Sequence, residues 1–193
     1  AKCMLGICYN CGYGVIQNDI EAVKLYREAA EQGVILAQWN LGCCYEIGEG
    51  VEKNEVEAAK WFIEAAKHGD AAAQYKAGIY YEYGFGVVKD KKKAFELYRK
   101  SAEQGDRRAQ YNLGIRYYFG RGIDKDYLEA VKWYRKAAEQ GYADAQYMLG
   151  LCYCVKQDKP EAVKWLQKAA KQGHEKAKKA LTEVSKQKGA EPK

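Results

Sequence analysis

Residues 37–69 read AQWNLGCCYEIGEGVEKNEVEAAKWFIEAAKHG, and this pattern returns along the whole chain. Its opening motif has counterparts 36 residues apart, at Ala1 (AKCMLG), Ala37 (AQWNLG), Ala73 (AQYKAG), Ala109 (AQYNLG) and Ala145 (AQYMLG). Self-similarity at a fixed period of this length is the signature of a repeat array. The sequence therefore predicts five tandem units, near residues 1–36, 37–72, 73–108, 109–144 and 145–174.

Each unit is predicted to form two helices. In the second unit, Leu41 and Tyr45 share one helical face, and Ala58 and Trp61 share the face of a second helix. The turn that begins at Gly48 separates the two helices, because glycine adopts the positive φ that such a turn needs. The second helices are expected to be capped by Asn18, Asn54, Asp90 and Asp126.

One such hairpin cannot bury its apolar face alone, so neighbouring units must stack. The predicted fold is all-α, a right-handed α-solenoid of five 36-residue helix-turn-helix repeats. We expect a single repeat array over 1–174, a capping helix over 175–187 and a disordered tail over 188–193. The fifth unit is four residues shorter at its turn, and Pro160 is expected near the start of its second helix.

Columns of small and large residues predict how the helices pack. A glycine column is expected to let a neighbouring helix come close, at Gly42, Gly78, Gly114 and Gly150. Large side chains are expected to fill the complementary spaces, at Trp61, Trp133 and Trp165, with Leu25 and Leu97 in the same column. Ala77 departs from its own column, where the other four units have leucine.

Composition excludes several classes of protein. Of 193 residues, 48% are hydrophobic and 30% are charged, which excludes a disordered chain. No apolar run approaches the roughly 18 residues of a membrane helix, so no membrane insertion is expected. The net charge of +6 is confined to residues 155–193, whereas a nucleic-acid-binding protein usually spreads its basic residues along a contact face. This basic end is interpreted as a solvated cap, with a patch for an acidic partner or an anionic lipid as the alternative.

Seven cysteines occur without a constant pairwise spacing. This usage favours reduced thiols in the cytoplasm over a disulfide framework, as does the absence of a signal-peptide pattern in residues 1–10. A thiol-based metal or redox site is a remote alternative, near Cys8, Cys11, Cys43 and Cys44. No metal or other cofactor is expected.

No motif for catalysis or for a small-molecule substrate is found. The Gly-x-Gly turns lack the Lys-Ser/Thr pair and the preceding strand of a phosphate-binding loop. His68 and His174, the only histidines, have no nucleophile or carboxylate at a meaningful spacing. The chain is therefore not expected to be an enzyme.

A protein or peptide partner is expected on the concave face, which the first helix of each unit usually lines. Columns that change chemistry between units mark this face. The candidate binding residues are Asn40, Lys76, Tyr80, Tyr83, Asn112, Arg116 and Phe119. Aromatic rings beside an arginine and amides suit a peptide groove. Tyr80, Tyr83 and Phe119 also fit core positions, because a tyrosine-rich stripe at helical spacing commonly packs between helices.

The columns A-x-x-x-L-G-x-x-Y-x-x-G-x-G-V and A-x-x-W/L-Y-x-x-A-A-x-x-G resemble the Sel-one-like repeat (SLR), a relative of tetratricopeptide repeats. The resemblance covers residue 1 to about residue 173. It implies a scaffold or adaptor in signalling or in the assembly of membrane-associated or secretion complexes. Some secreted members carry a regular cysteine pair in each repeat, a pattern that this chain lacks.

Two further expectations remain open. The chain is alternatively a regulatory or spacer segment of a longer multidomain protein or enzyme. The uncapped first helix, residues 1–11, exposes apolar surface that would permit end-to-end self-association.

Overall fold

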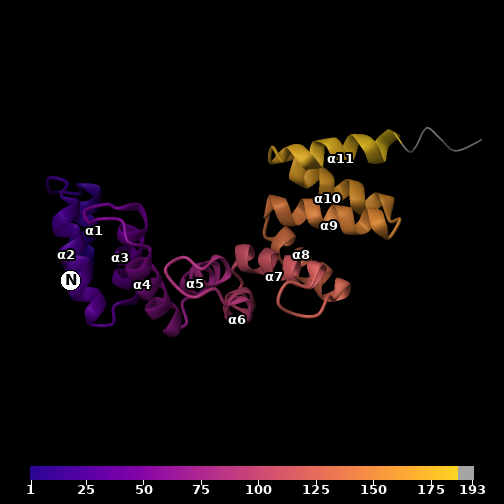
Figure 1. The fold of residues 1–193 in the computed structure, drawn as a ribbon. Helices are drawn as coiled ribbons and strands as arrows, with labels where there is room; N and C mark the ends of the chain where they lie inside the picture. Colours follow the sequence, from indigo (N-terminus) through magenta and orange to yellow (C-terminus); the bar gives the residue numbers. More distant parts are fainter. Residues whose placement is uncertain (187–193) are drawn as a thin grey trace, which may run out of the picture. The chain divides into compact units, whose positions relative to one another are not determined.

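The computed structural model of the protein describes residues 1–186, which contain eleven α-helices and no β-strand (Figure 1). The helices are α1 (Lys2–Cys11), α2 (Asp19–Glu31), α3 (Ile35–Ile47), α4 (Glu55–Lys67), α5 (Ala71–Tyr83), α6 (Lys91–Glu103), α7 (Arg107–Phe119), α8 (Tyr127–Glu139), α9 (Ala143–Val155), α10 (Lys159–Lys171) and α11 (Glu175–Lys186). The predicted all-α repeat fold is confirmed. Each described helix is too short or too polar to span a lipid bilayer.

The chain divides into two compact units, each larger than a single repeat. Unit 1 covers Ala1–Gln104, and unit 2 runs from Gly105 onward. In unit 1, the hairpins α1–α2, α3–α4 and α5–α6 follow one another, and each helix packs on the next. In unit 2, the hairpins α7–α8 and α9–α10 do the same, and α11 packs on α10 and α9. Helix α11 lies where the sequence predicts a capping helix, while residue 187 and the expected tail over 188–193 lie outside the described residues.

The helix starts follow the predicted capping column. Asn54 accepts hydrogen bonds from the backbone N–H groups of Val56 and Glu57, and Asp90 accepts them from Lys92 and Lys93. Asn18 and Asp126 cap α2 and α8 in the same way. These bonds satisfy N–H groups that have no partner within the helix.

The glycine column confirms the predicted close approach, but the partner differs from the prediction. A β-carbon on Gly78 would lie 2.9 Å from the ring of Tyr98, and one on Gly114 would lie 2.6 Å from the ring of Tyr134. Tyr98 and Tyr134 each stand one residue after the column of Trp61 in the sequence. Trp61 and its equivalents therefore do not fill the space over the glycines. The first and second helices of a repeat therefore pack by seating a side chain against a bare backbone.

Candidate functional site

Three of the four expected binding residues of unit 1, Lys76, Tyr80 and Tyr83, lie on α5, close to the last turn of α3, and the fourth, Asn40, lies on α3. Lys76 Nζ lies 2.8 Å from Glu46 Oε1, and the Tyr80 hydroxyl donates to the same oxygen at 3.0 Å. Lys76 Nζ also lies 5.4 Å from the centroid of the Phe62 ring, a cation–π arrangement. Lys76 is thus held between two repeats by an ion pair and an aromatic face, with its side chain 25% exposed.

Tyr80 was expected to line a binding face. The structure shows instead that its side chain is buried, at 2% exposure. Its ring packs against Phe62, with centroids 5.4 Å apart. Burial, together with the carboxylate of Glu46, raises the pKa of the Tyr80 hydroxyl well above its ordinary value. Tyr80 therefore stays neutral and acts as a packing residue that orients Glu46.

Tyr83, three residues further along, is 61% exposed and stacks on Phe85, with centroids 5.5 Å apart and an interplanar angle of 19°. Phe85 is 41% exposed and meets the ring of Tyr80 edge-on at 5.8 Å. An exposed aromatic pair is therefore anchored on a buried tyrosine. Large apolar area held in a fixed orientation is typical of residues that dominate binding energy.

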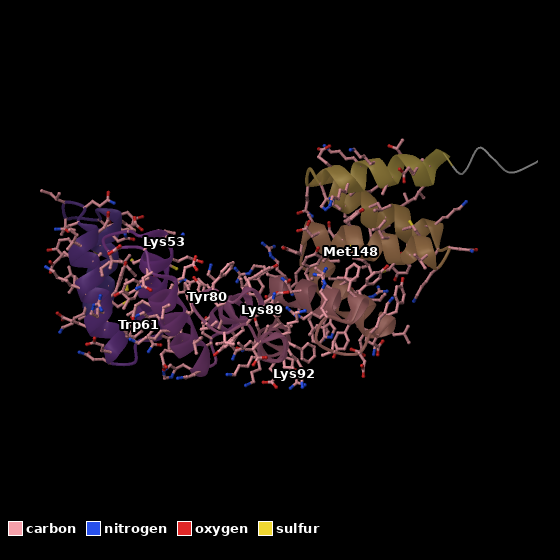
Figure 2. All side chains as sticks on the ribbon, viewed as in Figure 1. Lys53, Trp61, Tyr80, Lys89, Lys92 and Met148 are labelled. Carbon is pink, nitrogen blue, oxygen red and sulfur yellow. The ribbon has the colours of Figure 1, made fainter. Side chains whose placement is uncertain are left out.

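A small cavity of about 130 Å³ adjoins this pair. It is lined by Glu46, Lys53, Glu55, Tyr80 and Phe85. Two of these lining residues are labelled in Figure 2, Tyr80 on α5 and Lys53 in the turn before α4. Charged groups of both signs therefore lie beside the aromatic pair.

Unit 2 repeats the arrangement with different chemistry. Phe119 is 55% exposed, and the guanidinium carbon of Arg121 lies 5.2 Å from the centroid of its ring. Tyr118 meets Phe119 edge-on at 4.8 Å. An exposed ring from the end of a first helix is again paired with a side chain from the following turn.

Arg116 was also expected on the binding face. It is 2% exposed, so its guanidinium group does not offer a charge to a ligand. Its Nη1 atom donates to the backbone carbonyl of Arg121 at 3.3 Å, which ties α7 to its own turn. Asn112 is half-buried and donates from Nδ2 to the carbonyl of Arg108 at 3.0 Å. Asn40 is also half-buried.

Two columns of equivalent positions, both variable between repeats and both expected on the binding face, differ in how exposed their side chains are. Four of the five residues in one column are buried, namely Cys44, Tyr80, Arg116 and Cys152, while Cys8 is half-buried. Every residue of the other column is exposed, namely Cys11, Ile47, Tyr83, Phe119 and Val155. The expected surface therefore narrows to the second of these columns and to its neighbours in the Gly-x-Gly turns.

Phe85 and Arg121 are the candidate residues that the sequence analysis missed. Both occupy the middle position of a Gly-x-Gly turn, where the repeats carry Tyr13, Glu49, Phe85 and Arg121. That position carries a different residue in each of the four copies, aromatic in two, acidic in one and basic in one, while the glycines on either side stay fixed. This variation is a signal that could have identified them.

Among the described residues, the thiols and histidines are not gathered into a metal-binding cluster. All seven cysteines are unpaired, and burial raises the pKa of the Cys44 thiol to about 12. Within residues 1–186, no three His, Cys, Asp or Glu side chains are grouped so as to hold a metal ion. His174 has a carboxylate neighbour, although the sequence predicted none. Its Nε2 atom lies 3.1 Å from Asp144 Oδ1, and its Nδ1 atom accepts a hydrogen bond from the N–H of Ala177.

These features define a class of protein, a tandem array of α-hairpins with variable side chains at the ends of its first helices. The family model "Sel1 repeat" matches residues 1–34, 35–70, 71–106, 107–142 and 143–174. The chain therefore belongs to the Sel1 repeat family, a family of protein–protein interaction modules whose members are generally non-enzymatic scaffolds.

Solved structures with the same fold agree with this assignment. A protective antigen of uropathogenic Escherichia coli strains, described as displaying an SLR fold, is 35% identical with a TM-score of 0.91 over 95% of this chain. A Sel1 repeat protein from Oxalobacter formigenes is 40% identical, with a TM-score of 0.85 over 95% of this chain and 74% of its own. Cysteine-rich protein B of Helicobacter pylori is 26% identical, with a TM-score of 0.52 over 68% of this chain and 96% of its own.

The present chain spans 40% of the length of the E. coli antigen. No functionally curated protein shows significant similarity to it.

Proposed function

We propose that this protein is a non-enzymatic scaffold that binds a segment of a partner protein through the ends of its first helices. The observation that carries the proposal is the exposed pair Tyr83 and Phe85, whose rings stack on each other at 5.5 Å, with Phe85 edge-on against the buried Tyr80. In unit 2, Phe119 and Arg121 make the corresponding contact. The partner is a protein or peptide, and no chemistry is done on it.

The physical case rests on where the exposed apolar area lies. Each of these rings is fixed by a neighbour, so little side-chain entropy is lost when a partner covers it. Lys76 and Glu46 pair 2.8 Å apart beside the rings of unit 1 and offer polar contacts that orient a bound segment. Arg121 offers a cation and several donors beside Phe119 in unit 2. The two units thus present different chemistry at equivalent positions.

The test is a selection of peptides from a random display library on the whole protein, followed by Kd measurements on variants. Tyr83→Ala or Phe119→Ala is expected to weaken the selected peptides at least about tenfold, which is about 1.4 kcal/mol. Both rings are more than half exposed, so the melting temperature should stay within about 2 °C of the wild type. Leu128→Ala is the matched control, because Leu128 is 64% exposed on a second helix.

Peptides that bind both ring variants with unchanged Kd would refute the assignment of this surface. A second candidate function is a regulatory or spacer segment of a longer protein. It is supported by the E. coli antigen, in which a region similar to this chain makes up 40% of the length. Failure of the selection to yield any specific peptide would favour this second candidate.

Association between copies of the chain stays a prediction. Met4 and Leu5 on α1 are 59% and 44% exposed, which provides the apolar area that the sequence analysis expected there. A sedimentation experiment over a range of concentrations, with Met4→Ser and Leu5→Ser as the variant, would detect end-to-end contacts.

A further inference from the structure

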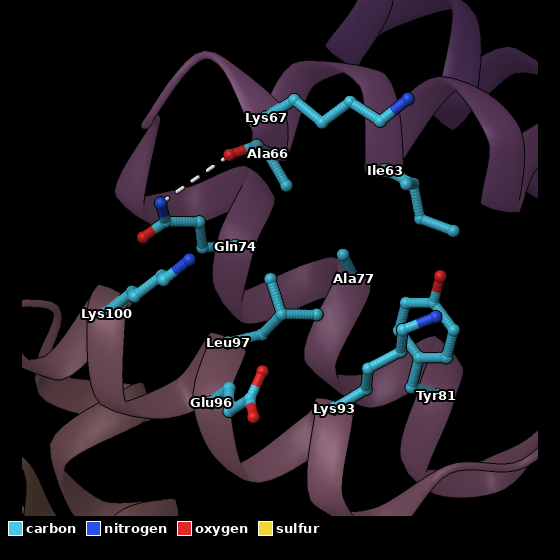
Figure 3. Close-up of a pocket in the computed structure, with 10 residues that line it drawn as sticks. All are labelled: Ile63, Ala66, Lys67, Gln74, Ala77, Tyr81, Lys93, Glu96, Leu97 and Lys100. Atoms are coloured by element: carbon cyan, nitrogen blue, oxygen red, sulfur yellow. Dashed lines mark hydrogen bonds between the residues drawn. The ribbon is translucent and has the colours of Figure 1, made fainter.

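A pocket of about 270 Å³ opens between α4, α5 and α6 of unit 1 (Figure 3). Ala77 of α5 is fully buried and contributes to its floor, with Leu97 of α6 beside it. Ile63 of α4 and Tyr81 of α5 complete the apolar lining. None of these residues belongs to the exposed aromatic pair described above.

The pocket exists because two neighbouring side chains, Ala77 and Leu97, are smaller than their equivalents in the preceding repeat. Leu41, the residue equivalent to Ala77 in the preceding repeat, is fully buried, and Trp61, the equivalent of Leu97, is 7% exposed. The equivalents of Ile63 and Tyr81 are Arg27 and Tyr45, and Arg27 Nη2 donates to the Tyr45 hydroxyl at 2.5 Å. The preceding repeat therefore fills with its own side chains the volume that stays open here.

The charges around the pocket are reversed relative to the preceding repeat. The charged residues that line it are Lys67, Lys93, Lys100 and Glu96. Their equivalents, 36 residues earlier, are Glu31, Glu57, Glu64 and Lys60. All four positions change sign, so a rim that is acidic in one repeat becomes basic in the next.

Helix α6 carries this positive charge at an unfavourable place. Its first turn is Lys91, Lys92 and Lys93 and contains no acidic residue, although a helix N-terminus favours negative charge. The other second helices, α2, α4, α8 and α10, each have an acidic residue there. Lys92 and Lys89, both labelled in Figure 2, add to the positive charge near the start of α6. Asp90, which caps α6, places one carboxylate there, so the start of the helix keeps a net positive charge.

The lysines are held close to the pocket by their neighbours. Lys93 Nζ lies 5.0 Å from the centroid of the Tyr81 ring, and Figure 3 shows the two side chains together. Lys67 forms an ion pair with Glu64, so part of its charge is compensated. With Glu64 and Glu96 counted against the three lysines, the rim keeps a net positive charge.

We propose that this pocket docks an acidic segment of a partner protein, which inserts one leucine or phenylalanine side chain over Ala77. The volume lies below the roughly 300–1,000 Å³ of small-molecule sites and suits a single side chain. The inserted group takes the place of the leucine side chain that the other repeats carry at the position of Ala77. Carboxylates that flank it meet Lys67, Lys93 and Lys100, which provide point charges.

The test measures binding of fluorescent peptides to the whole protein by anisotropy. The probe carries one leucine, or one phenylalanine, between two runs of glutamate, and a matched peptide has serine at the central position. At least one apolar probe is expected to bind at least about tenfold more tightly than the serine peptide. Equal binding of the serine peptide, or binding of no probe at all, would overturn the proposal.

Two variants separate the apolar and the electrostatic parts. Ala77→Leu restores the residue of the other four repeats, so the fold and the melting temperature are retained while the Kd rises at least about tenfold. Lys93→Glu combined with Lys100→Glu should raise it as much. Lys24→Glu on α2 makes the same kind of charge change at an exposed lysine and should leave the Kd unchanged.

Two other outcomes decide the nature of the ligand and the independence of the surface. Competition by single-stranded RNA as strong as that of unlabelled peptide would overturn a protein ligand in favour of a general polyanion. Tyr83→Ala should not change this Kd, because Tyr83 does not line the pocket. A loss of binding in Tyr83→Ala equal to that in Ala77→Leu would place the peptide on the aromatic pair and refute the pocket.

Discussion

The Nε2 atom of Gln104 donates to the Oε1 atom of Gln74 at 2.8 Å, while Gln74 itself donates to the carbonyl of Ala66 at 3.5 Å. This contact links the end of one second helix to the end of the next through a buried glutamine. The same pairs, each at 2.8 Å, are Gln140 with Gln110 and Gln172 with Gln146. Together these glutamine pairs form a ladder of hydrogen bonds along the repeats. The ladder satisfies polar groups that the stacking of repeats would otherwise bury without partners.

The ladder is broken in the second repeat, where His68 occupies the donor column. Gln38 Oε1 is buried there and has no hydrogen-bond partner among the described residues. His68→Gln is expected to supply the missing donor and to raise the free energy of unfolding by about 1 kcal/mol. Urea denaturation followed by circular dichroism measures the change. His68→Ala is the control, and an equal gain in that variant would contradict the hydrogen bond as the cause.

Gly86 meets the backbone of the preceding repeat, and its substitution should be costly. A β-carbon there would lie 2.2 Å from the carbonyl oxygen of Glu55, and the residue has a φ of 63°. Gly86→Ala is expected to lower the free energy of unfolding by about 3 kcal/mol. Gly69 has a φ of 87° with no atom within 4 Å, so Gly69→Ala should cost only about 1 kcal/mol. Equal losses in the two variants would show that the close contact has no role.

The shortened turn of the fifth repeat leaves Gln157 with a φ of 57°, a conformation that glycine adopts more readily. Gln157→Gly is expected to raise the free energy of unfolding by about 1 kcal/mol, because an L-side chain is strained in the left-handed region. Thermal denaturation would report this as a higher melting temperature. A lower melting temperature would mean that the Gln157 side chain makes a contact worth more than the strain.

Asp106 caps α7, and its charge makes stability depend on pH. Partial burial opposes its ionisation, but hydrogen bonds from Arg108 and from the N–H of Ala109 outweigh this and lower the pKa of the carboxyl. A pKa that is lower in the folded state gives stability that is present above about pH 4, the unfolded value, and is lost as pH falls through the folded value. Asp106→Asn keeps a capping side chain and removes the charge.

The difference in unfolding free energy between the wild type and Asp106→Asn should therefore be constant from pH 7 to about pH 5 and shrink below about pH 4. Denaturant titrations across this range measure it. A difference that grows on acidification would reverse the sign of the argument.

The thiols should differ widely in reactivity. Cys44 is 4% exposed, and burial raises its pKa to about 12, so almost none of it is thiolate at neutral pH. Cys11 is exposed. Alkylation of the native protein, followed by peptide mass mapping, should modify Cys11 well before Cys44. Urea should make all seven reactive, and early modification of Cys44 in the native state would indicate local opening of α3.

Local patterns predict the helices and their ends because these depend on neighbours in the sequence. Asn54 and Asp90 lie where a capping side chain reaches the next N–H groups, and Gly48 and Gly84 end the first helices with positive φ. The sequence does not separate Tyr80 from Tyr83 in the same way. Both lie on α5, three residues apart, and only the packing of Phe62 and Phe85 decides that one is 2% and the other 61% exposed.

By itself, the sequence determined the family, the five repeats and the helix pairs, because a residue pattern with a period of 36 reports directly on a unit that must stack. Only the tertiary structure decided which variable side chains reach solvent. Arg116 is a charged residue at a variable position, yet the turn at Arg121 encloses it. Ala77 is a small apolar residue in a column where the other repeats carry leucine, and a pocket opens beside it. Burial is a property of how neighbouring helices meet, and no single helix contains that information.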